Sequence, residues 1–323
     1  MFGMNSKVVI SICCITFNHA DYIEKCIEGF LAQNFPHKME IIIGDDLSSD
    51  GTREKLQKIQ LQHPDLIKVI YNQENMGANK NILSVLRQAK GEFIAFCEGD
   101  DYWIHEDKLY LQYKLLKTNP SVDFCFHSAY MDSEGEKKLH FKYGERTKKF
   151  YINDVLKVAG QFAPTSSYMF RRNIIYALPA WFPQSCIGDL FMEIYSMKKG
   201  GIYIPLPMSV YRVNSVGSWS ETIKSNLNVF TEKHLNIATH LRLAKQEFNG
   251  YEKYFNLKIA NVYLNMCTRF IIEKEYKLFK VYLEKANGIN EHFTRKQLLY
   301  NGLRFFPTII YYIHYLKAII KNK

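Results

Sequence analysis

The chain has 323 residues, of which 47% are hydrophobic, and its 42 Lys and Arg residues outnumber its 32 Asp and Glu residues, which gives a formal net charge of +10. This length fits one large or two ordinary domains with a substantial core, and the positive charge predicts anionic partners such as nucleic acid, anionic lipid or phosphorylated compounds. No run of roughly 18 apolar residues occurs, which argues against a membrane-spanning helix.

The cysteines and the start of the chain indicate a compartment. The seven cysteines form neither a Cys-x-x-Cys pair nor a zinc-type Cys/His spacing. An odd number of cysteines without such a framework predicts a reducing environment. Residues 1–7 lack the apolar core of a signal peptide. We therefore expect a cytoplasmic protein.

The first hundred residues alternate apolar runs with helical patterns. Near-continuous apolar runs, which are typical of strands buried on both faces, lie at 8–15, 39–43, 66–71 and 93–96. Between these runs, apolar residues recur at helical spacing. Strands that alternate with helices through short connections predict an α/β fold, with a doubly wound, mostly parallel sheet and flanking helices.

The fourth predicted strand ends in an acidic loop, Glu98-Gly99-Asp100-Asp101-Tyr102-Trp103. Open α/β sheets bind ligands at the carboxyl edge of their strands, where this loop should lie. The adjacent carboxylates of Asp100 and Asp101 repel each other unless a cation lies between them or one of them is protonated. Mg²⁺ and Mn²⁺ prefer such oxygen ligands and often bridge to phosphates. The loop therefore predicts a metal–diphosphate site, with a solvated turn as the alternative.

The rest of the chain is less regular. We expect a helix near 109–116, a strand at 122–127, a surface hairpin at 134–149 and short strands at 168–170, 202–204 and 208–213. Another helix begins near Asp189, with Glu193 one turn later. After about residue 222 helical periods dominate, at 227–248 and 251–288. We therefore divide the chain into a domain at 1–222 and a helical C-terminal region at 223–323.

Residues 294–323 combine six basic residues with no acidic ones, and their apolar residues recur near helical spacing. A basic amphipathic helix of this kind can lie in a membrane interface. A terminal helix that packs into the core would show a similar pattern. The segment therefore predicts either peripheral membrane contact or a core-packed end.

Three loops after strands share a further property. They read Thr16-Phe17-Asn18-His19, Gly44-Asp45-Asp46-Leu47-Ser48-Ser49-Asp50-Gly51-Thr52 and Glu98-Gly99-Asp100-Asp101-Tyr102-Trp103. In this order they resemble the family 2 glycosyltransferases, which have the GT-A fold, and the resemblance spans roughly residues 8–220. It implies a metal-dependent, inverting hexosyl- or N-acetylhexosaminyl-transferase. Such an enzyme would move a sugar from a UDP-sugar to a hydroxyl of a glycan or lipid-linked acceptor during synthesis of lipopolysaccharide or capsule.

The resemblance also implies a role for each matching residue. Five residues are expected to bind the nucleotide-sugar: Phe17, Asp46, Lys80, Asp100 and Arg212. Asp46 would accept a hydrogen bond from uracil N3–H, and Asp101 would bind Mn²⁺ or Mg²⁺. Asp189 would be the catalytic base, with Glu193 as its rival. The sequence departs from the family at Asn214, which stands where the family often has His, so its part in the phosphate or metal site stays open.

Other functions remain as alternatives. A nucleotidyltransferase of related fold would normally carry a Gly-rich phosphate loop after the first strand, and the Thr16–His19 loop contains no Gly. A non-catalytic nucleotide-sugar-binding module is a second alternative. No recognised nucleic-acid motif accompanies the positive charge, so we expect no nucleic-acid partner. The preferred location is the cytoplasm, with peripheral contact at the inner face of the cell membrane through 294–323.

Overall fold

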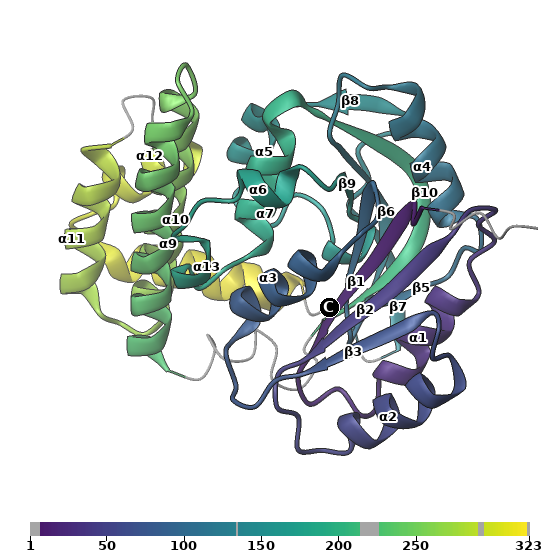
Figure 1. The fold of residues 1–323 in the computed structure, drawn as a ribbon. Coiled ribbons are helices and arrows are strands. Elements are labelled where there is room, and N and C mark those ends of the chain that lie inside the picture. The colour runs from purple at the N-terminus through teal and green to yellow at the C-terminus, as the bar shows by residue number, and fades with distance from the viewer. Residues whose placement is uncertain (1–6, 134, 214–225, 290–293, 322–323) are drawn as a thin grey trace, which may run out of the picture. The chain divides into compact units, whose positions relative to one another are not determined.

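The computed structural model describes residues 7–133, 135–213, 226–289 and 294–321 (Figure 1). The chain divides into two compact units, Met1–Val155 with Gln161–Ser225, and Leu156–Gly160 with Asn226–Lys323. The domain boundary that we predicted at residue 222 lies outside the described residues, and so does Asn214.

The first unit is built on a sheet whose first four strands are parallel. They stand in the order β3 (Ile67–Tyr71), β2 (Met39–Asp45), β1 (Ile10–Thr16) and β4 (Phe93–Glu98). In this register Ile12 pairs with Ile41 on one side and with Ala95 on the other. Every residue of β1 is buried, as expected for a strand covered on both faces. The predicted α/β class is therefore confirmed.

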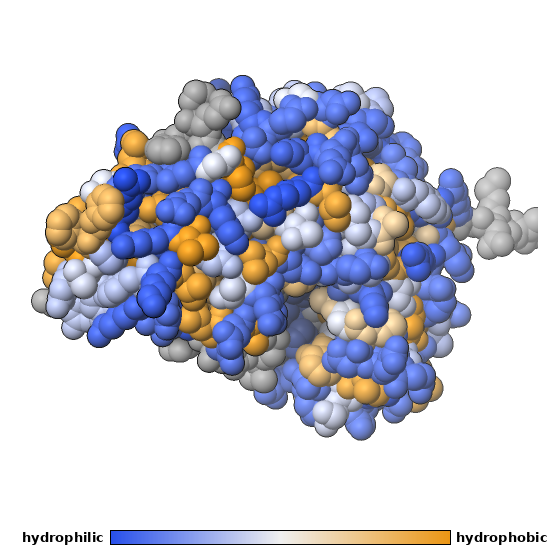
Figure 2. All heavy atoms as spheres, turned by 90° about the vertical axis from the view of Figure 1, so that its left-hand side faces the viewer, coloured by the Kyte–Doolittle hydropathy of each residue, from blue (hydrophilic) through white to orange (hydrophobic). Residues whose placement is uncertain are grey.

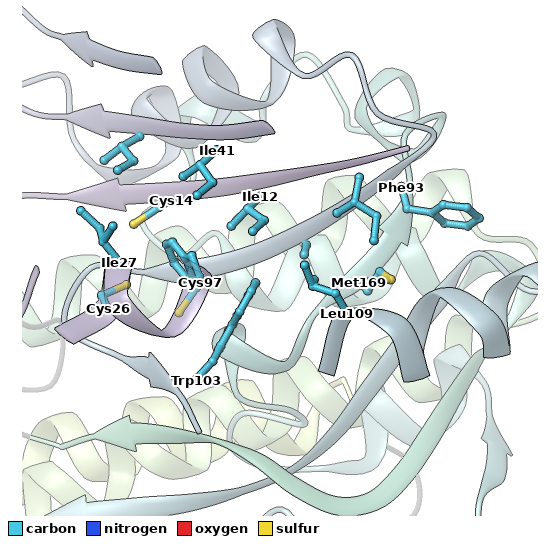
Figure 3. Close-up of a cluster of buried hydrophobic side chains, with 14 of the residues drawn as sticks. Ile12, Cys14, Cys26, Ile27, Ile41, Phe93, Cys97, Trp103, Leu109 and Met169 are labelled. Atoms are coloured by element: carbon cyan, nitrogen blue, oxygen red, sulfur yellow. The ribbon is translucent and has the colours of Figure 1, made fainter. Parts of the chain in front are cut away.

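Helices cover both faces of this sheet. On one face, the core drawn in Figure 3 joins strand residues to α1 (Ile23–Leu31), α2 (Thr52–Gln62) and α4 (Lys108–Thr118). Side chains alternate along a strand, so Gly44 points to the opposite face from Ile41 and Ile43. There α3 (Ala78–Gln88) packs so closely that a Cβ on Gly44 would lie 2.2 Å from Asn81 Oδ1.

The second half of the sheet adds antiparallel pairs. Beyond β4 the order continues with β9 (Met169–Arg171), β6 (Phe124–Ser133), β10 (Gly201–Arg212) and β5 (Tyr102–Trp103). The two short strands that we predicted at 202–204 and 208–213 are one strand, β10, whose register with β6 shifts between Ile204 and Ser209. The predicted hairpin at 134–149 is also wrong, because β7 (Glu136–His140) pairs with β6 and β8 (Lys148–Phe150) pairs with β10.

Short helices complete the first unit. They are α5 (Ile152–Lys157), α6 (Ile174–Ala177), α7 (Asp189–Ser196) and the 3-10 turns Thr165–Ser167, Phe182–Gln184 and Met197–Lys199. The helix that we predicted to begin near Asp189 is α7, and Asp189 is its first residue.

The second unit consists of helices α9 (Leu227–Glu247), α10 (Glu252–Ile272), α11 (Tyr276–Asn287), α12 (Arg295–Gly302) and α13 (Pro307–Lys321). Large side chains such as Phe255, Phe270 and Phe279 are fully buried between them. In the described parts of the chain, none of the helices has both the length and the apolar composition that a bilayer crossing requires. The molecular face drawn in Figure 2 intersperses hydrophobic with hydrophilic groups.

Candidate active site

Hydrogen bonds join the loops that follow β1 and β2. The Asn18 amide donates to Ser48 Oγ, and the Ser49 amide donates to Asn18 Oδ1, both at 2.9 Å. Asn18 and Leu47 both have positive φ angles, of 55° and 65°, so each loop turns sharply at these residues. The joined loops present the ring of Phe17, which is 37% exposed, as a surface on which a base could stack.

Asp46 anchors the segment that leads into α3. Its buried carboxylate accepts hydrogen bonds from the amides of Met76 and Gly77, at 2.9 and 2.8 Å, and from Asn72 Nδ2 at 3.0 Å. Oδ2 takes only one of these three bonds. An ionised carboxylate oxygen can accept two, so Oδ2 keeps capacity for an N–H donor from a ligand.

The same helix α3 positions Asp189. Asn79, in the first turn of α3, donates from Nδ2 to the carbonyls of Phe182 and Ser185, at 3.1 and 2.6 Å. A Cβ on Gly188 would lie 2.3 Å from Asn79 Oδ1, so this contact requires glycine immediately before Asp189. The start of α7 is therefore held by α3, whose own entry segment is held by Asp46.

The Asp100–Asp101 pair lies in the turn between β4 and β5, where both residues are buried. Oδ1 of Asp101 accepts the Arg212 amide at 2.9 Å, and the Arg212 guanidinium donates to the Asp100 carbonyl. That guanidinium also lies over the rings of Tyr22 and Tyr102. Arg212 therefore supports the acidic turn directly. Oδ2 of Asp101 is buried without a hydrogen-bond partner among the described residues.

Carboxylates crowd this edge of the sheet. Burial raises the pKa of Asp101 well above its ordinary value, and the charges of Asp100 and Glu98 add to the effect. Burial, followed by the charges of Asp100 and Asp189, raises the pKa of Glu98 to about 8. Asp189 therefore lies close enough to the acidic turn for its charge to raise the pKa of Glu98. The sequence alone could not show that the two are close in space.

Tyr211, like Glu98, belongs to this site although the sequence predicted no role for it. Burial raises its pKa, and the charges of Asp101, Glu98, Asp189 and Asp100 raise it further. A signal for both missed residues was present in the sequence, because Glu98 opens the acidic loop and Tyr211 directly precedes Arg212.

The acidic turn suits a divalent cation. No group of three His, Cys, Asp or Glu side chains in the described ranges is arranged to hold a metal ion by itself. The unsatisfied Oδ2 of Asp101 and the mutually repelling carboxylates nevertheless favour a cation whose other ligands are water and substrate phosphate. Asp100 and Asp101 are the residues that would hold it.

Two predicted residues stand apart from this cluster. Lys80 is exposed on α3, where it lines a surface cavity of about 450 Å³ together with Met76, Arg87 and Pro183. Glu193 is buried, and its Oε1 accepts hydrogen bonds from the Ala163 amide and the Tyr168 hydroxyl, both at 2.8 Å. Glu193 therefore supports neighbouring backbone, whereas the half-buried Asp189 is better placed to reach a substrate.

Comparisons with known proteins show the family to which the chain belongs. The model of the family described as "Glycosyl transferase family 2" matches residues 11–178. A Campylobacter jejuni protein named GalNAc(5)-diNAcBac-PP-undecaprenol beta-1,3-glucosyltransferase is 28% identical over 214 residues, which cover 63% of this chain and 64% of that protein. The chain spans about 60% of the length of curated Mycobacterium relatives to which it is 33% identical over 213 residues.

Two solved structures show a similar fold. Staphylococcus aureus TarS 1-349 with UDP-GlcNAc aligns with a TM-score of 0.66 and 16% identity, over 88% of this chain and 82% of that one. The Pyrobaculum calidifontis mannosyltransferase PcManGT with GDP-Man and Mn²⁺ aligns with a TM-score of 0.58 and 18% identity, over 93% and 81%. At these identities the likeness concerns the fold alone.

Proposed function

Since the chain belongs to glycosyl transferase family 2, we propose that it transfers a hexosyl or N-acetylhexosaminyl group from a UDP-sugar to a hydroxyl of a glycan or lipid-linked acceptor. The reaction would serve the synthesis of a surface polysaccharide such as lipopolysaccharide or capsule. The observation that carries this proposal is the convergence of Asp46, the Asp100–Asp101 turn and Asp189 on one edge of the sheet.

The names of similar proteins support the finer parts of the proposal. The Campylobacter relative is named for a diphosphoundecaprenol-linked acceptor. The TarS structure contains UDP-GlcNAc, and the mannosyltransferase structure contains Mn²⁺ with GDP-mannose. Both neighbours contain a nucleotide-sugar and the mannosyltransferase contains a divalent metal, which supports these parts of the proposal. We take uridine as the base because Asp46 retains an acceptor for an imide N–H.

The chain's own residues suggest a single-displacement mechanism. Phe17 stacks on the base, Asp46 accepts its N–H, and Asp100 holds the ribose or sugar. Asp189 removes the proton from the acceptor hydroxyl as the hydroxyl attacks the anomeric carbon opposite the leaving diphosphate, so the configuration inverts. A divalent cation, Mn²⁺ or Mg²⁺, would bind Asp101 and neutralise charge on the leaving group.

Two basic residues would assist. Arg212 would contact the diphosphate beside the acidic turn, because its guanidinium retains donors beyond the one that binds the Asp100 carbonyl. Lys80 would face the nucleotide from α3. Residues 1–222 would form the catalytic domain, and 223–323 would form the helical C-terminal region.

We also propose that the second unit contacts a membrane. In α13 and the turn before it, Phe305, Ile309, Tyr312 and Leu316 follow one another at helical spacing, and each is at least 46% exposed. The opposite side of α13 is held inside the unit, where Ile310 is buried and His314 hydrogen-bonds Tyr300. Residues 294–323 carry basic residues and no acidic ones. Anionic lipid at the cytoplasmic face of the cell membrane suits such a surface.

Donor binding tests the function. We would measure binding of a panel of UDP-sugars with and without Mn²⁺, for the wild type, for Asp101→Ala and for the surface control Asp65→Ala. We expect metal-dependent binding of one UDP-sugar that is lost only in Asp101→Ala. If folded protein binds no UDP-sugar, the role of Asp46 is wrong, and GDP- and dTDP-sugars become the next donors to test.

Vesicle binding tests the membrane contact. The double variant Phe305→Ser/Ile309→Ser should lose sedimentation with anionic vesicles, whereas Leu61→Ser, an exposed apolar residue on α2, should not. Equal sedimentation of the double variant and the wild type would contradict the proposed contact.

A further inference from the structure

A cluster of three cations surrounds the ring of Tyr102, the residue that directly follows Asp101. Lys25 Nζ lies 4.4 Å from the ring centroid, the Arg212 guanidinium carbon 4.5 Å and Lys137 Nζ 5.6 Å. They come from three separate elements, α1, β10 and β7. Tyr102 is nearly buried, at 4% exposure, so its ring is held in place and all three cations lie near the same ring. We call this group the Tyr102 cation cluster.

Acidic groups act on the cluster through their nearby charge, as Asp132 does on Lys137, rather than through salt bridges. Within the described ranges, none of its three cations forms a salt bridge with a carboxylate. Asp132 stands opposite Lys137 in the β6–β7 register, but its Oδ1 accepts the Gly135 amide. The Tyr102 hydroxyl and the nearby charge of Asp132 raise the pKa of Lys137, so this lysine stays charged.

Such an arrangement is costly without an anion. Each cation gains a favourable interaction with the electron-rich ring face, but that gain is small at exposed sites. The three like charges repel one another, and an anion between them would relieve this repulsion. Local conflicts of this kind are expected where a protein binds a ligand.

We propose that Lys25 and Lys137 of the Tyr102 cation cluster bind the diphosphate of a lipid-linked acceptor, while Arg212 serves the donor diphosphate. The inference rests on the proposed function and deepens it by naming the charged part of the acceptor. A donor diphosphate at the Asp100–Asp101 turn would be neutralised there by a metal ion. A second diphosphate in the same active site needs its own positive charge, and Lys25 and Lys137 supply charge that the donor site does not use.

The proposal has a consequence for the acceptor. The Arg212 guanidinium lies over the Tyr102 ring and also binds the Asp100 carbonyl, so a diphosphate held by Lys25 and Lys137 at this ring lies beside the reacting centre. The hydroxyl that is glycosylated should then belong to a sugar close to the diphosphate, in a short lipid-linked saccharide. A cytoplasmic glycan without phosphate would be a poor acceptor.

Direct binding separates the acceptor site from the donor site. We would saturate the protein with UDP and Mn²⁺ and titrate farnesyl diphosphate, inorganic pyrophosphate and farnesol, using the wild type, Lys25→Gln/Lys137→Gln and the control Lys148→Gln. Lys148 is a matched exposed lysine that lies over the Phe150 ring at 4.8 Å. We expect the double variant to bind both diphosphates at least about tenfold more weakly, with farnesol binding unchanged.

The outcomes are distinguishable. If the double variant and the wild type bind farnesyl diphosphate equally, the inference is wrong. If the double variant loses affinity for UDP in a separate titration, the cluster serves the donor. Weakened binding of farnesyl diphosphate but not pyrophosphate would show a response to the lipid rather than to phosphate, which also overturns the inference. Failure of the wild type to bind UDP would instead contradict the proposed function. In that case, pyrophosphate would be titrated without UDP into the wild type and the double variant, and equal binding would still show that the cluster is not an anion site.

Discussion

Two buried charged residues, one in each unit, differ in how fully hydrogen bonds satisfy their charged groups. In the helical unit, Lys258 is 3% exposed, and its ammonium donates to the carbonyls of Val158 at 2.6 Å and Gly160 at 3.1 Å. In the first unit, Asp101 is 1% exposed, and only one of its carboxylate oxygens has a hydrogen-bond partner among the described residues. The charges of the neighbouring carboxylates of Asp100 and Glu98 add to the effect of burial and raise its pKa further.

The difference is the one expected between a structural charge and a charge that binds a ligand. A buried charge is tolerated when hydrogen bonds compensate its lost hydration, as at Lys258. At Asp101 that compensation is incomplete, and the remaining cost would be removed by a cation and a substrate. The comparison predicts that changes near Asp101 will affect catalysis and pH dependence, whereas changes at Lys258 will affect folding alone.

The largest expected effect is at Asp189. Asp189→Asn should lower kcat by about 10²–10⁴-fold with little change in UDP-sugar affinity, because a positioned base acts on the acceptor in the transition state. Glu193→Gln is the matched control, since its amide oxygen can still accept from Ala163 and Tyr168. Single-turnover transfer and donor titration would be measured for both. A larger loss of kcat in Glu193→Gln would exchange the two roles.

The second effect concerns Glu98 and pH. Its pKa is raised from the ordinary 4.5 to about 8, so the folded state keeps a proton that the unfolded state loses in this interval. The stabilisation is complete below pH 4.5 and is lost as the pH rises through 8. In metal-free buffer the wild type should therefore lose on the order of a few kcal/mol of folding free energy across this window.

Glu98→Gln should flatten that dependence, whereas the exposed Glu54→Gln should not. Urea unfolding at several pH values would measure it. An equally steep fall in the Glu98→Gln protein would show that another group causes the dependence. Added Mn²⁺ should also reduce the slope in the wild type, because a cation favours the ionised carboxylates.

A third effect, smaller and restricted to folding, is expected at Lys258. Lys258→Met removes both donors and leaves the carbonyls of Val158 and Gly160 without them, which should cost about 1–3 kcal/mol of unfolding free energy. The exposed Lys253→Met serves as control. Urea titration and activity per folded molecule would be measured together. If Lys258→Met lowers kcat while its free energy of unfolding is unchanged, the distinction between Lys258 and Asp101 is wrong.

The smallest effect is expected at Asn79, which links α3 to the segment before Asp189. Asn79→Ala leaves the carbonyls of Phe182 and Ser185 without this donor, and we expect about 1 kcal/mol of destabilisation. Because the start of α7 would be held less firmly, kcat should fall several-fold while UDP-sugar affinity is kept. Asn75→Ala, in the exposed loop before α3, is the control. Weaker donor binding with normal kcat would mean that Asn79 acts on the nucleotide side instead.

The positions of the parallel strands followed from the sequence because their signal is local. A strand buried on both faces needs a continuous apolar run, and β1, β2 and β4 each show one. The antiparallel part was harder to predict. Residues 134–149 looked like a hairpin, but their partners are β6 and β10, and β10 begins some fifty residues further along the chain.

The sequence by itself determined the α/β class, the acidic turn and the residue types at the carboxyl edge, because strand periodicity and loop composition are properties of neighbouring residues. Only the tertiary structure decided which acids come together at this edge and which acid holds a proton. Asn79 reaches a carbonyl 106 residues away, and the pKa of Glu98 depends on Asp189. Burial and charge depend on what surrounds a side chain in space, and that environment forms only when distant segments pack together.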